Sequence, residues 1–170
     1  NPREGRWPYL LARIRQDEGD LGRARALLSE AAALAPNYPV IELRRADLLF
    51  KTGDVTAAAQ AYQAYLSRAP HDAHALLGLG RVAIQQREWH EAEAHLLTAI
   101  RADPSLGSSH ALLVSVYEEL GETQKAAAAR TRGGKARRFR EPDDPWFEAL
   151  ADDCYDVEKL SVLADLAIET

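Results

Sequence analysis

Apolar residues along this chain recur with the period of an amphipathic α-helix. In residues 76–84 the spacing of three or four residues places on one helical face Leu76, Leu77, Leu79, Ala83 and Ile84. The same spacing recurs along most of the chain and predicts four pairs of helices, at 6–18 and 21–34, 38–52 and 55–68, 72–86 and 89–102, and 106–120 and 123–132. A helix with one apolar face buries that face against another helix, so the pattern predicts an all-α protein.

The predicted pairs repeat every 34 residues. That interval separates the members of three columns: Pro2, Pro36, Pro70 and Pro104; Ala24, Ala58, Ala92 and Ala126; and Gly19, Gly53 and Gly121, with Arg87 in the remaining slot. Each Pro ends a repeat because it cannot continue a helix. Each Gly suits a left-handed turn after the first helix of a pair. The alanines and Gly80 suit positions where two helix backbones approach closely.

Residues 2–138 resemble the tetratricopeptide repeat family. The residues that carry the resemblance are Leu76, Leu79, Gly80, Ala83, Ala92, Leu96 and Pro104 in the third repeat, and Leu113, Tyr117, Gly121 and Ala126 in the fourth. The resemblance implies a right-handed α-solenoid of stacked antiparallel helix pairs, with about four 34-residue repeats, and the residues after it are expected to add a C-terminal helical cap. The expected solenoid spans 1–138, with repeats near 5–36, 37–70, 71–104 and 105–138, and a linker and two helices follow at 139–170.

The repeat pattern fails at the end of the fourth repeat. Six of the eleven residues at 130–140 are basic, and Gly133 and Gly134 predict the end of a helix. Three interpretations of this basic stretch remain open: a solvated helix end, a docking site for the acidic C-terminal segment, and RNA binding through Arg-Gly-Gly.

Charge is divided unevenly between the repeats and the C-terminal segment. Residues 1–140 carry a net charge of +4 and residues 141–170 a net charge of −9, and the overall charge of −5 does not favour nucleic acid. Asp144 and Pro145 predict the start of a short helix at 145–153. We expect the acidic segment 141–170 to pack against the basic end of the fourth repeat, with most of the contact from Trp146, Phe147 and Leu150.

The two ends of the sequence are those expected of a piece of a longer repeat array. The chain begins without Met, and Pro2 takes the place of a closing Pro from a preceding repeat. Residues 157–168 read as the first helix of a further repeat, which stops just before its expected Gly. We expect either a homodimer contact through this C-terminal helix, over Val162 and Leu166, or a following helix in the native protein.

The remaining candidates for chemistry are weak. The pairs His71 and His74, and His90 and His95, have neither the i, i+4 spacing nor a nearby third ligand, and Cys154 stands alone. The sequence therefore predicts no catalytic residue, no metal site and no cofactor. No apolar run approaches the ~20 residues of a membrane span, and no signal-peptide pattern opens the chain. These observations predict no targeting or transmembrane segment and leave the localisation open.

The concave side of the expected solenoid is the best candidate for a binding site. The first helices that line it contribute mainly apolar residues flanked by Arg, together with one Asp and one His. The set is Arg6, Tyr9, Arg13, Leu43, Asp47, Phe50, His74, Leu77, Arg81 and Ile84. An apolar groove edged by Arg suits an amphipathic helix or an extended segment with acidic residues, although some of these residues could pack only between repeats. The predicted function is a non-enzymatic scaffold that binds a peptide or helix of a partner protein. The alternative is an accessory repeat region of a larger multidomain enzyme or redox protein.

Overall fold

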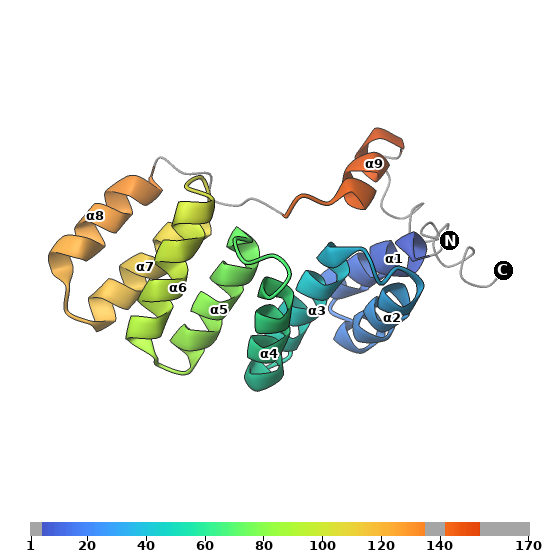
Figure 1. Ribbon diagram of the computed structural model, residues 1–170, viewed down its shortest axis with the longest axis horizontal. Coiled ribbons are helices and arrows are strands. Elements are labelled where there is room, and N and C mark those ends of the chain that lie inside the picture. Colours follow the sequence, from blue (N-terminus) through green and yellow to red (C-terminus); the bar gives the residue numbers. More distant parts are fainter. Residues whose placement is uncertain (1–4, 135–141, 154–170) are drawn as a thin grey trace. The chain divides into compact units, whose positions relative to one another are not determined.

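The computed structural model describes residues 5–134 and 142–153, which form a series of helices (Figure 1). The helices are α1 Arg6–Asp17, α2 Leu21–Leu34, α3 Pro39–Lys51, α4 Val55–Leu66, α5 Ala73–Gln85, α6 Trp89–Ala102, α7 Gly107–Glu119, α8 Thr123–Gly133 and α9 Pro145–Asp153. Each of the eight helices expected from the 34-residue repeat ends within two residues of its predicted bounds. The second predicted C-terminal helix, at 157–168, and the dimer contact over Val162 and Leu166 lie outside the described residues.

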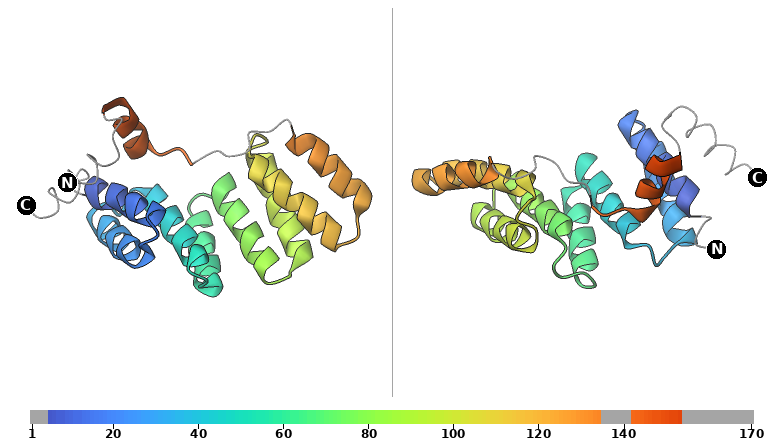
Figure 2. Two further views of the ribbon diagram at one scale, coloured as in Figure 1. Left: turned by 180° about the vertical axis from the view of Figure 1, so that it is seen from behind. Right: turned by 90° about the horizontal axis from the view of Figure 1, so that it is seen from above.

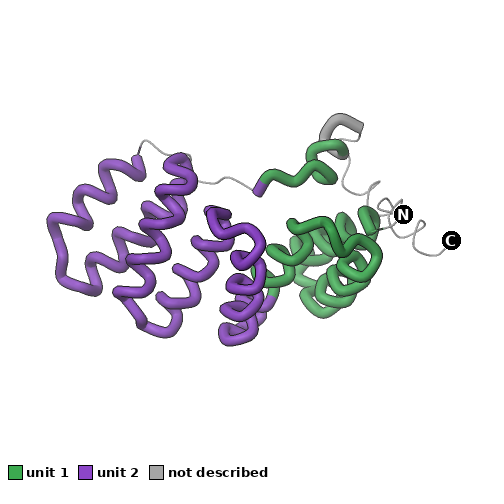
Figure 3. The backbone as a smooth tube through the Cα atoms, in the orientation of Figure 1, with its two compact units in different colours: residues 1–48, 143–170 green, residues 49–142 purple. Residues whose placement is uncertain are grey.

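The chain divides into two compact units, which are described separately (Figure 3). The N-terminal unit comprises residues 1–48 and 143–170, and the central unit comprises residues 49–142. In the N-terminal unit α1 packs against α2, and in the central unit each helix from α4 to α8 packs against the next (Figure 2). This arrangement of stacked helix pairs is that of an all-α solenoid, as the sequence predicted.

The turns within the pairs confirm the role expected of the glycine column. The φ angles of Gly19, Gly53 and Gly121 are 87°, 86° and 73°, in the left-handed region that Gly enters at little cost. Arg87, which replaces Gly in the third repeat, adopts the same conformation with a φ of 61°. The turn geometry is therefore imposed by the repeat even where the sequence supplies a residue that disfavours it.

The second helices begin directly after acidic residues, but only some of these residues cap a helix. The Asp20 carboxylate accepts the backbone N–H of Arg23 at 3.0 Å, and the Asp54 carboxylate accepts that of Ala57 at 3.2 Å. Glu122 stands in the same position before α8 and makes no side-chain cap. The Asp side chain is one methylene shorter than that of Glu, and this length suits a bond to the free N–H groups of the first helical turn.

The small-residue column lies where helices approach closely, as predicted. Ala24, Ala58 and Ala92 are fully buried, and a Cβ at Gly80 would come within 2.7 Å of Leu96. The central unit has an apolar cluster that includes Ala83, Ala92, Leu96, Leu113, Val116 and Tyr117. In the N-terminal unit the corresponding cluster includes Leu11, Leu28 and Ile41, with Trp146 packed against it.

The prediction that the acidic segment packs on the basic end of the fourth repeat is wrong for the part that the structure describes. α8 does end at Gly133, as predicted, and Arg130 pairs with Glu118 at 2.7 Å. However, Asp144, Trp146 and Phe147 contact α1 and Tyr38 in the N-terminal unit. The side chain of Leu150 lies outside the described residues. The contacts that Asp144 and Phe147 make with α1 therefore determine where the segment docks, and the net charge of residues 130–140 does not.

Candidate functional site

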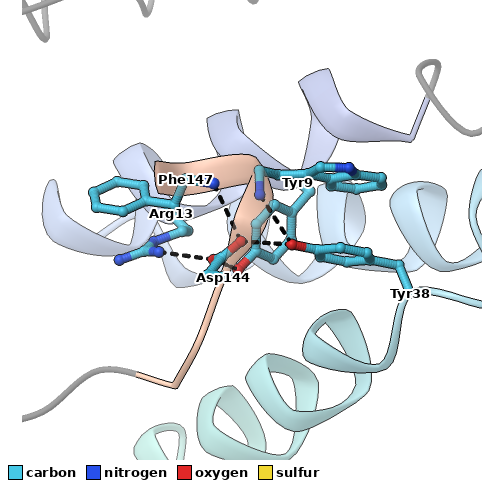
Figure 4. Close-up of polar contacts among 6 residues, drawn as sticks. Tyr9, Arg13, Tyr38, Asp144 and Phe147 are labelled. Atoms are coloured by element: carbon cyan, nitrogen blue, oxygen red, sulfur yellow. Dashed lines mark hydrogen bonds and ion pairs between the residues drawn. The ribbon is translucent and has the colours of Figure 1, made fainter. Parts of the chain in front are cut away.

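One face of α1 and the residue before α3 form a surface on which the C-terminal segment lies (Figure 4). Tyr9 and Arg13 are four residues apart and therefore share a face of α1. Tyr38 immediately precedes α3, and its ring meets that of Tyr9 edge to face, with the centroids 5.9 Å apart. We call Tyr9, Arg13 and Tyr38 the α1 surface, and residues 143–149 the docked segment.

Asp144 is the polar centre of the contact. Its carboxylate accepts hydrogen bonds from the Tyr9 hydroxyl, from the Tyr38 hydroxyl at 2.7 Å and from Arg13 Nη1 at 3.0 Å. The carboxylate also accepts the backbone N–H of Phe147 at 3.2 Å, so Asp144 caps α9 with Pro145 at the first helical position, as predicted. The Asp144 side chain is only 3% exposed, and the four donors replace the water that burial removes.

The aromatic residues after Asp144 complete the contact. The Trp146 ring stacks on Tyr38 with the centroids 3.8 Å apart and the planes 6° from parallel, and its edge meets Tyr9 at 5.8 Å. The backbone N–H of Trp146 donates to the Tyr38 hydroxyl at 3.1 Å. Phe147 lies under the Arg13 guanidinium, 3.8 Å from it, in cation–π geometry. Arg13 therefore contacts both the carboxylate and an aromatic ring of the docked segment.

The electrostatics of the surface keep both tyrosine hydroxyls protonated. Burial is the main cause that raises the pKa of Tyr9, and the hydrogen bond to Asp144 and its charge raise this pKa further. Burial also raises the pKa of Tyr38, with a further contribution from Asp144, while the N–H of Trp146 acts in the opposite direction. A protonated hydroxyl donates a hydrogen bond, so the surface is matched to a carboxylate.

The structure places the predicted site residues of the N-terminal unit in different environments. Tyr9 and Arg13 lie in the α1 surface, and Arg6 lies over the ring of Trp7 at 5.7 Å. Asp47 is half-buried. Leu43 is only 1% exposed and is not open to a partner.

In the central unit, two predicted site residues are in direct contact. The Arg81 guanidinium lies 4.3 Å from the centre of the Phe50 ring, an arrangement like that of Arg13 on Phe147. Leu77 and Ile84 are half-buried and pack against the apolar cluster that holds Ala83 and Leu96. His74 lies in the first turn of α5, where its backbone N–H donates to Asp72 at 3.0 Å.

Sequence reasoning missed the partners that the structure brings to Tyr9 and Arg13. Nothing in the sequence pattern marks Tyr38 as a site residue, and the charge pattern points Asp144, Trp146 and Phe147 toward the basic end of the fourth repeat instead. One signal was available: the run Asp144 to Phe147 holds a carboxylate and two large aromatic rings, and Tyr9 and Arg13 offer the complementary groups on one helical face.

Neither a metal site nor a membrane span is found within residues 5–134 and 142–153. Among these residues, no three His, Cys, Asp or Glu side chains gather closely enough to hold a metal ion. None of the helices formed by the same residues combines the length and apolar character needed to cross a membrane.

Stacked antiparallel helix pairs, with a face of α1 that holds a peptide segment, define a helical-repeat protein of the interaction-scaffold class. Tetratricopeptide repeat family models match residues 16–66, 43–107 and 77–132. The chain belongs to the tetratricopeptide repeat family, and its repeats indicate a protein-interaction scaffold.

Two curated relatives are much longer than this chain. Cellulose synthase 2 operon protein C of Komagataeibacter xylinus is 31% identical over 141 residues, which cover 81% of this chain and 10% of the relative. Cellulose synthase operon protein C of Xanthomonas axonopodis pv. citri is 31% identical over 134 residues, which cover 76% of this chain and 9% of the relative. The chain thus spans about a tenth of the length of these relatives.

Solved structures share the fold. A thermophilic TPR protein of Thermus thermophilus superimposes with a TM-score of 0.68 at 18% identity, covering 96% of this chain and 98% of the other. MamA (41-end) from Desulfovibrio magneticus RS-1 superimposes with a TM-score of 0.66 at 21% identity, covering 79% of this chain and 76% of the other. At these identities the similarity shows a common fold.

Proposed function

We propose that the first helices of this protein bind a partner segment that carries acidic residues, in extended or helical form. The observation that carries the proposal is the set of hydrogen bonds from Tyr9, Arg13 and Tyr38 to the carboxylate of Asp144. The α1 surface holds a short acidic segment by its side chains, which is the chemistry of peptide recognition.

The central unit supports the same proposal with a second Arg on a first helix. Arg81 stands 68 residues, or two repeats, after Arg13 and is stacked on Phe50. A guanidinium that is held over an aromatic ring is positioned in advance and loses less side-chain entropy when a carboxylate binds. Leu77 and Ile84, which lie on the same helix as Arg81, remain half-exposed and supply apolar surface beside it.

Binding of defined peptides to the full chain tests this proposal. The probes are fluorescently labelled peptides in two sets of matched length, one with Asp and Glu and one with Asn and Gln at the same positions. Fluorescence anisotropy should show that the acidic set binds more tightly than the neutral set. Arg81→Glu should lower the affinity for acidic peptides that bind in the central unit by about tenfold, equivalent to ~1.4 kcal/mol.

Arg25→Glu is the matched control. Arg25 is exposed on α2, a second helix, and this variant makes the same change of charge away from the first helices. Its affinity for acidic peptides should stay within about twofold of that of the unmodified chain, because charges more than ~10 Å from a ligand are largely screened. Equal affinity for acidic and neutral peptides, or equal weakening by both Arg variants, would contradict the proposal.

The second candidate function is that these repeats form the accessory region of a larger protein. The observation that favours it is the 31% identity to two cellulose synthase operon C proteins, of which the matched residues cover only 10% and 9%. In this case the repeats would serve an assembly that builds a polysaccharide. Mass spectrometry of the native gene product tests it, and a mass equal to that of the 170-residue chain would reject it.

A further inference from the structure

We infer that residues 143–149 are a resident ligand of the α1 surface, which a partner segment of the same chemistry must displace. The inference rests on the proposed function and specifies its ligand: a carboxylate at the start of a helical turn, followed by two aromatic residues. It also adds a regulatory consequence, because the α1 surface is occupied in the protein by itself.

The contact has the composition of an interface between a receptor and a peptide. The donors to the Asp144 carboxylate from outside its own helix lie more than 100 positions earlier in the chain: 135 for Tyr9, 131 for Arg13 and 106 for Tyr38. The segment provides one buried carboxylate and two aromatic side chains, and the receptor provides tyrosines and an Arg. Aromatic residues and Arg are the groups that dominate the energy of protein interfaces.

The position of each group defines what a competing partner needs. Three donors of the α1 surface converge on the carboxylate of Asp144, so an Asn in its place would leave a donor or its own amide poorly satisfied. Trp146 contacts Tyr38 through two groups: its ring stacks on the Tyr38 ring, and its backbone N–H donates to the Tyr38 hydroxyl. A residue with an aromatic ring and a free N–H is therefore required at the second position after the acid.

The docked segment can leave because its contact is small. Phe147 is 44% exposed, and Glu148 beside it is exposed as well. The contacts that hold the segment come from α1 and Tyr38 and involve the first turn of α9. Covalent attachment compensates for the small area, since a tethered ligand acts at an effective concentration on the order of millimolar.

A labelled peptide of residues 143–149 tests the inference with the full chain. The peptide, acetylated and amidated at its ends, is titrated with the unmodified chain and with the Asp144→Ala, Trp146→Ala double variant, in which the resident segment is disabled. We expect the double variant to bind the peptide at least about tenfold more tightly, because the resident segment no longer competes for Tyr9, Arg13 and Tyr38. Circular dichroism checks that the double variant retains its helices.

Two controls show that the peptide binds at the α1 surface. Adding Arg13→Glu to the double variant should remove most of the binding, whereas adding Arg25→Glu should leave it unchanged. A peptide with Asn in place of Asp144 should bind the double variant about tenfold more weakly, since it lacks the charge that the Tyr and Arg donors stabilise.

Three results would overturn the inference. They are equal affinity of the peptide for the unmodified chain and the double variant, no binding to either, or binding that Arg13→Glu leaves intact. If these results occur while acidic peptides still bind through Arg81, only the resident-ligand inference fails. If the acidic peptides also fail to bind, the proposed function fails with it.

The remaining alternative is that the segment docks on a second copy of the chain. Sedimentation of the unmodified protein over a range of concentrations distinguishes the two arrangements. A monomer at all concentrations supports the resident ligand, and a dimer that Asp144→Ala dissociates would overturn it.

Discussion

Asp144 shows how one residue sets the position of a whole segment. Its carboxylate is buried against two hydroxyls and a guanidinium, and it also starts α9 by accepting the N–H of Phe147. The same side chain thus fixes the local helix and its long-range contact. Hydrogen bonds to a buried charge contribute about 1.5–3 kcal/mol each, so Asp144 outweighs any single aromatic contact of the segment.

The first prediction concerns the ionisation of Tyr9 and Tyr38. Both residues have a pKa raised above the ordinary value of 10.0 while the segment is docked, mainly by burial and then by Asp144. The docked state therefore holds protons that the undocked state loses, so docking keeps its full strength below pH 10 and weakens as the pH rises above 10. Absorbance of tyrosinate should show more tyrosines ionised near pH 10 in Asp144→Ala than in the unmodified chain.

Glu148→Ala is the control for this titration. Glu148 is exposed on α9, and its substitution removes the same charge without touching either hydroxyl. The tyrosine titration of this variant should follow that of the unmodified chain. Identical curves for the unmodified chain and Asp144→Ala would contradict the prediction. They would show that neither the Asp144 carboxylate nor the docking of its segment raises the pKa of Tyr9 and Tyr38.

The second prediction concerns Arg87, which occupies the left-handed position where three other repeats have Gly. Arg87→Gly should stabilise the protein by about 0.5–1 kcal/mol, because Gly has no Cβ to clash at a positive φ. Gly53→Ala makes the opposite change at the corresponding position, where nothing lies near the added Cβ, and should destabilise by a similar amount. Urea unfolding measures the stability of both variants. A loss of stability in Arg87→Gly would show that the positive φ of Arg87 is not strained.

At the scale of the helices, the sequence predicted almost everything in the repeats. Four repeats impose the same requirements at the same positions, so a single irregular position, such as Arg87, does not obscure the pattern. Gly19, Gly53 and Gly121 mark the turns, and apolar residues at helical spacing mark the buried faces. Helix bounds follow because the turn and the closing Pro limit each helix on both sides.

The docking position of α9 could not be predicted in the same way. This segment has no repeated counterpart, so nothing in the spacing of the chain points to Tyr9, Arg13 or Tyr38. Net charge indicated residues 130–140, but exposed charges are screened over ~10 Å and are worth only ~0–1 kcal/mol per pair. The stacking of Trp146 on Tyr38 and the donors to Asp144 depend on the folded positions of residues far apart in sequence.

The third prediction concerns the packing of α4 against α5. A Cβ at Gly78 would lie 2.4 Å from the ring of Tyr62, which is fully buried and cannot move away. Gly78→Ala should therefore destabilise the central unit by about 1–3 kcal/mol, despite the gain of ~1 kcal/mol in helix propensity. Thermal unfolding followed by circular dichroism measures the change.

Gly22→Ala separates the two effects. Gly22 lies in the first turn of α2, where the nearest atom to an added Cβ is Asp20 Oδ1 at 3.8 Å. Only helix propensity then operates, and the variant should be unchanged or up to about 1 kcal/mol more stable. An increase in the stability of Gly78→Ala would contradict the prediction, because it would show that the Tyr62 ring moves to make room for the added Cβ.

At the scale of the whole molecule, removal of the C-terminal segment should weaken the protein. Deletion of residues 142–170 uncovers the aromatic rings of Tyr9 and Tyr38, which Trp146 covers in the intact chain. The truncated protein should unfold at a lower temperature and associate more readily, because exposed aromatic surface favours contact between molecules. Differential scanning fluorimetry and size-exclusion chromatography measure the two effects, and an equally stable monomer would contradict the expectation.

The central claim is that the α1 surface holds the Asp144 carboxylate of the docked segment, and a double-mutant cycle between Tyr9 and Asp144 tests it most directly. The cycle compares the free energies of unfolding in urea of the unmodified chain, of the single variants Tyr9→Phe and Asp144→Ala, and of the variant that carries both of these substitutions. We predict a coupling free energy of about 1–3 kcal/mol, the contribution of a hydrogen bond to a buried charge. Additive effects, with a coupling below ~0.5 kcal/mol, would show that Tyr9 does not hold Asp144 and would contradict the claim.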